Sequence, residues 1–563
     1  MTDLAELVAG NIDIWTGAIQ RKSGAGRGGG KRIGLYGIER LRALILDLAV
    51  RGKLVRQDAG DEPAAALLPK MAAERQRRIK AREIKAARGP TTPSSKPFDL
   101  PSGWVWLPLG QTGNIFTGNS INSSLRSELA TNSEGRPFVA TKDVGYGLDP
   151  VDYDNGLTVA LDDQRFNVAR PHSVFICAEG GSAGRKIAVS DREISFGNKL
   201  IANEPWSQIE PRYVLYTYLS DFFFDCFSKD MTGIIGGISR AKFLELPFPL
   251  PPLAEQRRIV AKVDELMALC DALERESADS ITAHQGLVEN LLATLVDSSD
   301  ATDLSRQWAR LEGHFDTLFT TDASIDALKK RILDLAVRGK LVQQDAEDEE
   351  ATVLLKKIKA WQAGKLARRK IRLPRKPLKP IAEGDAPFAM PKNWSAVRLG
   401  EIIYLQSGDG LTSAQMRPGD VPVFGGNGIN GHHDAQNIFR ETIVVGRVGF
   451  YCGSIHVTPS AAWVTDNAFV THFDETSIHL EFLRLLLSAT NLKEDENATA
   501  QPVISGSKVY PIAVGLPPLA EQRRIVAKVD ALMALCDALK ARVAEAAQTQ
   551  RHLADAITQR AAN

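Results

Sequence analysis

The sequence has few cysteines, no long hydrophobic run and almost no net charge, and each shortage excludes a class of protein. Its 563 residues contain 5 cysteines with no C-x-x-C spacing, which argues against a disulfide framework or a zinc site. An apolar stretch at 214–227 is interrupted by Asp221 and Asp225, so no membrane span is expected. The first residues are acidic where a signal peptide is basic, which predicts a soluble, cytoplasmic protein. With 69 basic and 68 acidic residues, any basic surface for nucleic acid has to be local.

Motifs of catalysis and cofactor binding are also missing. Residues 25–32, AGRGGGKR, resemble a P-loop, but Ala25 replaces the first glycine and Arg32 the magnesium-binding Ser or Thr. GNGING at 426–431 matches a dinucleotide fingerprint without the strand–helix–strand context, which indicates a turn-rich loop. The histidines at 432–433 have no further ligands near them. Without a nucleophile elbow, an H-E-x-x-H motif or a methyltransferase tetrapeptide, we expect no catalytic residue, no metal and no cofactor on this chain.

The sequence does contain an internal duplication. LPPLAEQRRIVAKVDELMALCDALE at 250–274 recurs at 516–540 with two changes, Glu265/Ala531 and Glu274/Lys540. Three shorter pairs keep the same order: ILDLAVRGKLV at 45–55 and 332–342, the tryptophan-containing openings at 97–110 and 387–400, and ISRAK and ISGSK at 238–242 and 504–508. The chain therefore consists of two copies of the same order of segments: a short helix, a variable region and a long helix.

The second long repeat has no short copy after it, and the unmatched short copy lies near the N-terminus. If the two chain ends meet, the halves are related by a pseudo-twofold axis, as in a closed dimer. The sequence therefore predicts that the N-terminal helix packs on the C-terminal one.

Both long repeats have the apolar spacing of a coiled-coil seam, four and three residues apart. A continuous helix is expected from 254 to about 296. In the short element, Ile325, Leu328, Ile332 and Leu335 share one face, and Gly339 is a plausible C-terminal cap. The seam positions are Ile259, Val263, Leu266, Cys270, Leu273, Ile525, Val529, Leu532, Cys536 and Leu539.

Basic runs at 70–89 and 356–379 follow the short helices and lead into proline-rich linkers. They fit either a solvated helix face or a position near phosphates. The variable regions, 98–250 and 388–516, hold short β-type runs between turn residues, so each is expected to be an α+β globule. Residues 21–32 are expected to form a flexible basic loop.

Within the variable regions, Arg, Lys and Asn stand beside glycine-rich loops. These side chains read guanine and adenine edges in DNA, although each of them is also suited to a structural or phosphate-binding role. The DNA-binding candidates are Lys142, Ser182, Arg185, Lys186, Asn198, Lys199, Arg240, Lys242, Asn427, His433, Arg447, Tyr451, Asn467 and Lys508.

The paired motifs, in this order and over nearly the whole chain, resemble the specificity subunit of type I restriction–modification enzymes, in the subgroup with an N-terminal copy of the short helix. The resemblance implies that each variable region is a target recognition domain for one half of a bipartite, asymmetric DNA site. It implies that the long helices form an antiparallel coiled coil that sets the spacer. It also implies two modification subunits and further restriction subunits as partners, which would bind the S-adenosylmethionine, ATP and Mg²⁺ that this chain lacks.

The expected fold is α+β, with two recognition domains separated by long helices and the chain ends packed together. The offset between the copies is 290 at the tryptophans (394 minus 104) and 266 at the long repeats (516 minus 250), so residues in the middle of the two domains cannot be matched from sequence. An alternative is a coiled-coil scaffold with two domains for ligands other than DNA. The expected segments are 1–97 (N-terminal helices and linker), 98–252 (first domain), 253–387 (central helices and linker), 388–518 (second domain) and 519–563 (C-terminal helix).

Overall fold

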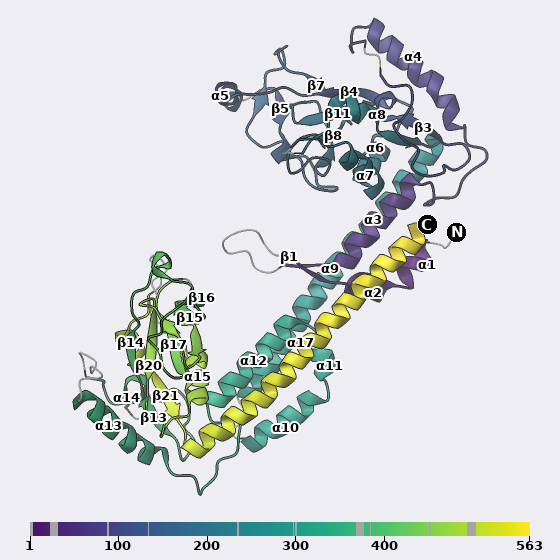
Figure 1. Ribbon diagram of the computed structural model, residues 1–563. Coiled ribbons are helices and arrows are strands. Elements are labelled where there is room, and N and C mark those ends of the chain that lie inside the picture. Colours follow the sequence, from purple (N-terminus) through teal and green to yellow (C-terminus); the bar gives the residue numbers. More distant parts are fainter. Residues whose placement is uncertain are drawn as a thin grey trace. The chain divides into compact units, whose positions relative to one another are not determined.

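The computed structural model divides the chain into two compact units (Figure 1). The first contains Met1–Asp279 and Ala546–Asn563, and the second contains Ser280–Glu545. The C-terminal end therefore belongs to the same unit as the N-terminal end. No helix in the described part of the chain is long and apolar enough to cross a membrane. The structure describes residues 4–22, 32–86, 89–132, 134–233, 236–296, 298, 301–367, 377–382, 384, 386–449, 452–492 and 503–562.

The first unit joins the two chain ends through helices. Tyr36 Oη, at the start of α3, donates a hydrogen bond of 2.8 Å to Asp555 Oδ1 near the end of α17, and Arg40 forms an ion pair with the same carboxylate at 2.9 Å. The predicted packing of the N-terminal helix on the C-terminal one is thus confirmed. The helical and hairpin elements of this unit are α1 (Leu4–Ala9), α2 (Ile12–Gly17), β1 (Gln20–Lys22), β2 (Arg32–Gly34), α3 (Tyr36–Val50), α4 (Leu67–Lys80), the first part of α9 (Leu253–Val296) and the end of α17 (Leu519–Ala562).

The first variable domain, residues 105–250, is built on an antiparallel sheet with the order β4-β11-β8-β9. A second sheet has the order β6-β5-β10-β7, and a two-stranded ribbon pairs β12 with β3. The elements are β3 (Val105–Pro108), β4 (Gly113–Thr117), α5 (Ser123–Thr131), β5 (Arg136–Val139), β6 (Thr158–Val159), β7 (Val168–Ala169), β8 (Val174–Cys177), β9 (Ile187–Val189), β10 (Ile194–Phe196), β11 (Leu200–Pro205), α6 (Pro211–Leu219), α7 (Asp221–Lys229), α8 (Arg240–Glu245) and β12 (Pro247–Leu250).

The second variable domain, residues 395–516, follows the same plan. Its four-stranded antiparallel sheet has the order β14-β20-β17-β18, a smaller sheet has the order β16-β15-β19, and a ribbon pairs β13 with β21. The elements of this unit, apart from α9 and α17, are α10 (Ala301–Glu312), α11 (Phe315–Leu318), α12 (Asp322–Val337), α13 (Ala351–Ala367), β13 (Ser395–Arg398), α14 (Leu399–Ile402), β14 (Tyr404–Ser407), β15 (Val421–Gly425), β16 (Gly428–His433), β17 (Thr442–Gly446), β18 (Ile455–Thr458), β19 (Trp463–Val464), β20 (Ala468–His472), α15 (Leu480–Ala489), α16 (Gly506–Val509) and β21 (Ala513–Leu516).

In each unit the short helix runs antiparallel to the long helix beside it. Arg42 of α3 contacts Asp271 of α9, whereas Gln57 and Asp61 in the loop after α3 contact Glu255 and Arg258 near the start of α9, so the two helices run in opposite directions. Lys329, Gln344 and Asp348 contact Asp537, Glu521 and Arg524 of α17 in the same way.

The repeated LAEQRR motif fastens each variable domain to its long helix. Glu255, 1% exposed, accepts hydrogen bonds from Trp104 Nε1 at 2.9 Å and Gln57 Nε2 at 2.7 Å. Burial raises the pKa of the Glu255 carboxyl, which these two donors oppose. The side chain of Gln256 accepts from Glu210 N and donates to the backbone of Gln208 and Pro251. Both buried polar side chains of the motif are thus hydrogen-bonded, and both recur unchanged as Glu521 and Gln522.

The same fastener occurs in the second unit. Glu521 accepts a hydrogen bond of 2.6 Å from Gln344, and Gln522 accepts from His479 N at 2.8 Å. All ten seam residues are at most 8% exposed. Those of α17 share one core with the end of α9 and with α12, so the seam is covered by more than a single partner helix. The predicted α12 face is buried, and Gly339 has the positive φ of +70° expected of a cap.

Candidate nucleic-acid interface

A loop tied down by backbone hydrogen bonds follows strand β8 in the first domain. We call residues 177–186, the turn 197–199 and the segment 236–238 the first loop frame. The loop closes on itself and is joined to the turn before β11 and to the segment before α8. Its bonds are Gly184 N to Cys177 O (2.8 Å), Ala183 N to Gly180 O (2.9 Å), Ala178 N to Lys199 O (2.8 Å), Leu200 N to Gly197 O (3.0 Å) and Ile238 N to Ala178 O (3.0 Å).

The second domain repeats these five hydrogen bonds after strand β17. The second loop frame consists of residues 446–449 and 452–455, the turn 465–467 and residues 503–504. An isolated bridge between Val448 and Val503 also matches one between Glu179 and Gly237. The corresponding bonds are Gly453 N to Gly446 O (2.7 Å), Cys452 N to Gly449 O (2.9 Å), Arg447 N to Asn467 O (2.9 Å), Ala468 N to Thr465 O (3.1 Å) and Ile504 N to Arg447 O (2.9 Å).

The matched bonds give a residue correspondence that the sequence left open. Ala178 corresponds to Arg447, and Lys199 corresponds to Asn467, because each pair makes the same backbone contact. Two domains of different length thus present different side chains on one backbone geometry.

Several candidates of the first domain lie together, along with a tyrosine that the sequence reasoning missed. Tyr146, 56% exposed, places its Oη 3.0 Å from Ser182 Oγ, and the ammonium of Lys186 lies 5.3 Å from the centre of its ring. Lys186 also donates to Thr141 O at 3.0 Å. Lys142, next in the chain, is exposed and 3.3 Å from the carboxylate of Asp143. An aromatic residue between two glycines was the available signal for Tyr146.

The other candidates of the first domain differ in whether their side chains contact other residues of the domain. The Arg185 guanidinium stacks on Phe224 at 5.0 Å. Arg240 donates from Nε and Nη2 to Ile115 O, and Lys242 forms an ion pair with Glu245, so both side chains of α8 have partners within the domain. Asn198 and Lys199 are exposed at the turn of the loop frame.

In the second domain, the side chain of Arg447 contacts residues of the same domain around the second loop frame. Its guanidinium lies 5.3 Å from the Phe469 ring, and Nη1 is 3.4 Å from both Ser407 Oγ and Asp466 O. Asn467 is exposed beside it, and Asn427 is exposed in the turn between β15 and β16. Ser454 Oγ joins that turn to the frame by donating to Gly426 O at 2.9 Å.

Three further candidates of this domain have different positions. His433 is 4% exposed, accepts from Arg417 N at 3.0 Å and packs its ring edge-on against Trp463, which argues against a direct contact with DNA. Lys508 is exposed on α16. Tyr451 lies outside the described residues.

Apolar side chains are exposed around both frames. Ile429 is 57% exposed two residues after Asn427, and Val503, which bridges to Val448, is 43% exposed. Together with Tyr146, they place an exposed apolar or aromatic side chain beside each polar loop.

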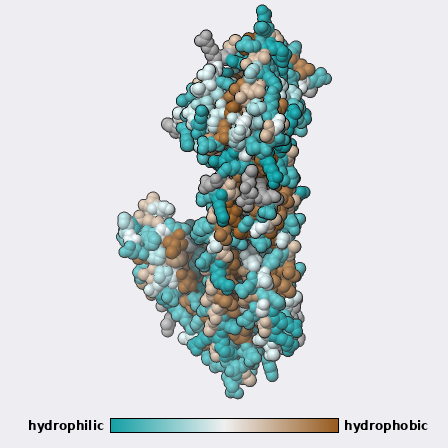
Figure 2. Space-filling view, turned by 90° about the vertical axis from the view of Figure 1, so that its right-hand side faces the viewer, coloured by the Kyte–Doolittle hydropathy of each residue, from teal (hydrophilic) through white to brown (hydrophobic). Residues whose placement is uncertain are grey.

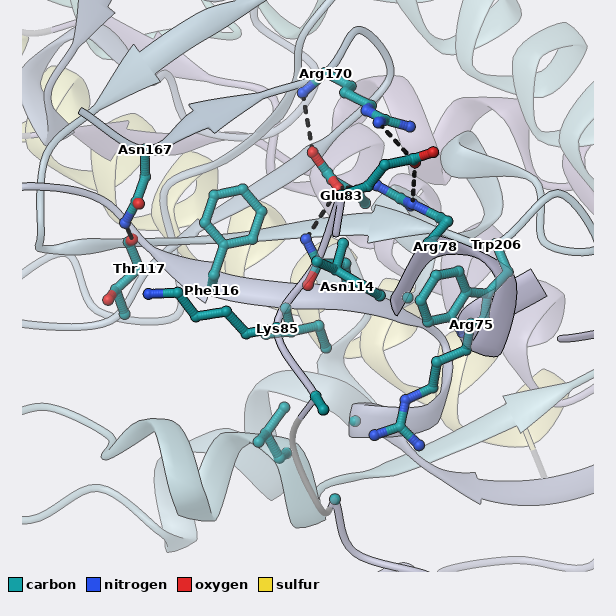
Figure 3. Close-up of a pocket in the computed structure, with 18 of the residues that line it drawn as sticks. Arg75, Arg78, Glu83, Lys85, Asn114, Phe116, Thr117, Asn167, Arg170 and Trp206 are labelled. Atoms are coloured by element: carbon teal, nitrogen blue, oxygen red, sulfur yellow. Dashed lines mark hydrogen bonds and ion pairs between the residues drawn. The ribbon is translucent and has the colours of Figure 1, made fainter. Parts of the chain in front are cut away.

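The basic run of α4 lies against the edge strand β4 of the first domain and lines a cavity of about 720 Å³. Arg78 is 3% exposed, pairs with Glu204 at 2.8 Å and stacks on Trp206, so this part of the run is structural. Figure 3 shows Lys85 extending beside Phe116 towards Thr117, with Arg170 joined to Glu83 above it. Neither of the two interpretations of this run, a solvated helix face or a position near phosphates, was therefore complete, because one arginine is buried in an ion pair. Part of the second basic run, at 368–376, lies outside the described residues.

No group of three or more His, Cys, Asp or Glu side chains within the described ranges is arranged to hold a metal ion. The five cysteines are all free in the structure, and four of them are buried.

Known proteins resemble this chain along its whole length. The family model of the type I restriction modification DNA specificity domain matches residues 101–283 and 391–548. The chain is 34% identical to the type I restriction enzyme EcoEI specificity subunit of Escherichia coli and 35% identical to the EcoAI specificity subunit of the same organism, over 99% of both chains in each case. A chain from a structural study of complex assembly and conformational transition of the type I R-M system is 18% identical, with a TM-score of 0.49 over 83% of this chain and 99% of that one.

Proposed function

The chain belongs to the family of type I restriction–modification DNA specificity subunits, and on that basis we propose that each of its two variable domains reads one half of an asymmetric DNA site through its loop frame. DNA sequence recognition is the role of the family. The division of the site between the domains is the finer step.

The repetition of one backbone frame with different side chains supports this division. A reader of base edges needs a fixed backbone and variable polar side chains. The five matched hydrogen bonds supply the fixed part, and the exchange of Lys199 for Asn467 is an instance of the variable part. Identical domains would favour a palindrome, whereas unlike ones favour an asymmetric site.

The long helices set the distance between the half-sites and bind the partner subunits in this proposal. Five leucines on α9 and α17 are 36–52% exposed, and hydrophobic patches interrupt the hydrophilic surface of the helical part in Figure 2. Exposed leucines on helices suit contacts with other subunits. The five are Leu269, Leu287, Leu291, Leu535 and Leu553.

The chemistry belongs to the partners in this proposal. Two modification subunits would bind S-adenosylmethionine and methylate the site, and restriction subunits would use ATP and Mg²⁺, in the cytoplasm. This chain would contribute no catalytic residue and bind no cofactor.

Domain exchange tests the proposal. Residues 98–250 would be replaced by the same region of another specificity subunit, and genomic methylation would be sequenced in cells that also carry the modification subunits. We expect one half of the methylated site to change and the other to remain. A change in both halves, or in neither, would contradict the division of the site.

Lengthening the helix after Glu274 tests the spacing. The expected result is a longer preferred spacer between unchanged half-sites. An unchanged spacer would show that the long helices do not set it.

A further inference from the structure

We propose that Lys199 in the first domain and Asn467 in the second occupy one matched base-reading position, so that the side chain there selects a base in each half-site. This inference rests on the proposed function and assigns it to a particular residue. It follows from the backbone contacts, the exposure and the chemistry of the two side chains.

The backbone fixes this position in both domains. The carbonyl oxygen of Lys199 accepts from Ala178 N at 2.8 Å, and that of Asn467 accepts from Arg447 N at 2.9 Å. The next residue, Leu200 or Ala468, begins the central strand β11 or β20. Its backbone N donates a hydrogen bond to the carbonyl oxygen three residues earlier, that of Gly197 or Thr465, which closes the turn. The Cα atom is therefore held between a loop and a sheet strand, and only the side chain is left to vary. A reading residue needs such a support.

The side chains at this position are not used inside the domain. Both are exposed, and neither forms a side-chain hydrogen bond or ion pair with any residue that the structure describes. The other cations of the frames are engaged, since Arg185 and Arg447 stack on phenylalanine rings and Lys186 binds Thr141 O. Polar groups that the fold leaves unsatisfied at a fixed position are available to a ligand.

The surroundings suit a DNA surface. The preceding residues, Asn198 and Asp466, are also exposed, and their side chains suit base edges, since asparagine pairs with adenine and a carboxylate accepts from the N4 amino group of cytosine. Tyr146 reaches the first frame through Ser182, and Val503 belongs to the second, so an exposed apolar side chain is part of each surface.

The two side chains differ in the base that they suit. A lysine ammonium donates to the O6 and N7 acceptors of guanine, whereas an asparagine amide pairs with N6 and N7 of adenine. The proposal therefore predicts guanine opposite position 199 and adenine opposite position 467.

The test is the pair of exchanges Lys199→Asn and Asn467→Lys, made one at a time in the full-length chain assembled with its modification subunits. Binding would be measured by selection from a duplex library with randomised half-sites. Lys199→Asn is expected to change the preference from guanine to adenine at one position of one half-site, by about ten- to a hundredfold, and to leave the other half unchanged. Asn467→Lys is expected to produce the reverse change in the other half.

Two further variants give the measurement its controls. Lys199→Arg keeps the guanine-reading donors and should retain the original base. Lys96→Asn makes the same chemical change on an exposed residue of the linker before the first domain and should leave all preferences unchanged. Equal thermal unfolding of the four variants and the parent would show that the fold is intact.

Two outcomes would overturn the proposal. If Lys199→Asn weakens binding equally on all sequences and reduces its salt dependence, Lys199 contacts a phosphate. If both exchanges leave every base preference intact, the position does not read DNA. If the parent complex itself shows no two-part sequence preference, the proposed function fails, which is a separate result.

Discussion

Helix α4 in the first unit and helix α13 in the second contact their variable domains at corresponding positions, and we call these contacts the outer junctions. The side chains at the two outer junctions differ in charge. By the alignment of the short repeats, Arg78 of α4 corresponds to Lys365 of α13. By strand pairing, Glu204, opposite Asn114, corresponds to His472, opposite Tyr404. In the first unit, Arg78 and Glu204 form a buried ion pair. In the second unit, burial, together with the nearby charges of Arg440 and Lys365, lowers the pKa of His472 to about 4.

This difference contrasts with the LAEQRR fasteners, which hardly differ between the units. The fasteners join helix to domain through Glu255 and Gln256 in one unit and Glu521 and Gln522 in the other, with matching donors in Gln57 and Gln344 and in the backbone N of Glu210 and His479. The outer junction involves strands of the variable sheets, where the two domains diverge. The LAEQRR fastener, which we call the inner junction, is thus nearly the same in both units. The outer junction differs between the units, as do the variable domains that it contacts.

The largest expected effect comes from removing the buried ion pair. Arg78→Ala removes the ion-pair partner of Glu204, which is 6% exposed in the parent and keeps Asn114 Nδ2 and Arg170 N as donors. Removing one partner of a buried pair costs about 3–5 kcal/mol. We expect α4 to lose its protection from hydrogen exchange, measured by mass spectrometry of the intact protein.

Lys365→Ala is the matched control, and it removes a cation that has no carboxylate partner among the described residues. Within the part of the chain that the structure describes, its ring contact is with Trp361 on the same helix, at 5.6 Å. We expect a change of less than about 1 kcal/mol in the free energy of unfolding. Equal losses in the two variants would show that the outer junctions are equivalent after all.

The glycines that end the short helices provide a test of the inner junction. Gly52 and Gly339 have φ of +68° and +70°, and an added Cβ would meet Pro101 and Trp104 in one unit or Pro391 and Trp394 in the other. Strain and crowding together are expected to cost about 2–4 kcal/mol for Gly52→Ala and for Gly339→Ala.

Calorimetry of each glycine variant would measure the loss, and the comparison of the two is its own control. The inner junctions are alike, so similar losses are expected. A large loss in one unit and none in the other would contradict the equivalence of the fasteners.

The parts of this fold that the sequence predicts are those that depend on local pattern and repetition. The seam residues, the α12 face, the cap at Gly339 and the meeting of the chain ends follow from spacing and from the order of the repeats. The prediction of a turn-rich loop over GNGING at 426–431 is only partly correct, because Gly426 and Asn427 form the turn and residues 428–431 belong to strand β16. The pairing of β16 with β15 involves glycines, which no strand propensity favours.

The candidate site is less predictable because tertiary contacts decide which side chains remain available. Arg78 stands in an ordinary basic run, and only the fold places Glu204 against it. His433 follows a loop, yet its ring is buried on Trp463. The correspondence between Lys199 and Asn467 depends on backbone hydrogen bonds across segments of different length, which a residue offset does not contain.

His472 makes the outer junction of the second unit sensitive to acid. Its pKa falls from the usual 6.5 to about 4 in the folded protein, because burial disfavours the charged imidazole. The neutral form is thus the folded one, and its contribution to stability is complete above pH 6.5 and is lost as the pH falls towards 4. We expect the unfolding temperature to decrease over this range.

His472→Gln separates this effect from general acid denaturation, since a glutamine amide can keep the contact that His472 Nε2 makes with Gln406 Oε1 at 3.0 Å. The variant should have a shallower decrease between pH 6.5 and 4 than the parent, measured by calorimetry. Identical pH profiles would show that His472 is not the group responsible.

The smallest expected effect concerns the charge difference between the long repeats. Arg42 pairs with Glu274 at 2.8 Å in the first unit, whereas in the second unit the corresponding residue Lys540 pairs with Asp326. Each pair is exposed, so Glu274→Lys or Lys540→Glu should cost about 0.5–1 kcal/mol by placing like charges together, and added salt should reduce the loss. Each charge also disfavours packing of a short helix against the other long repeat. Lys540 of α17 would repel Arg42 of α3, and Glu274 of α9 would repel Asp326 of α12. The double variant should therefore be no better than the sum of the two, measured by urea unfolding at low and high salt. Unchanged stability in both single variants would mean that each short helix accepts either charge at this position of the long repeat.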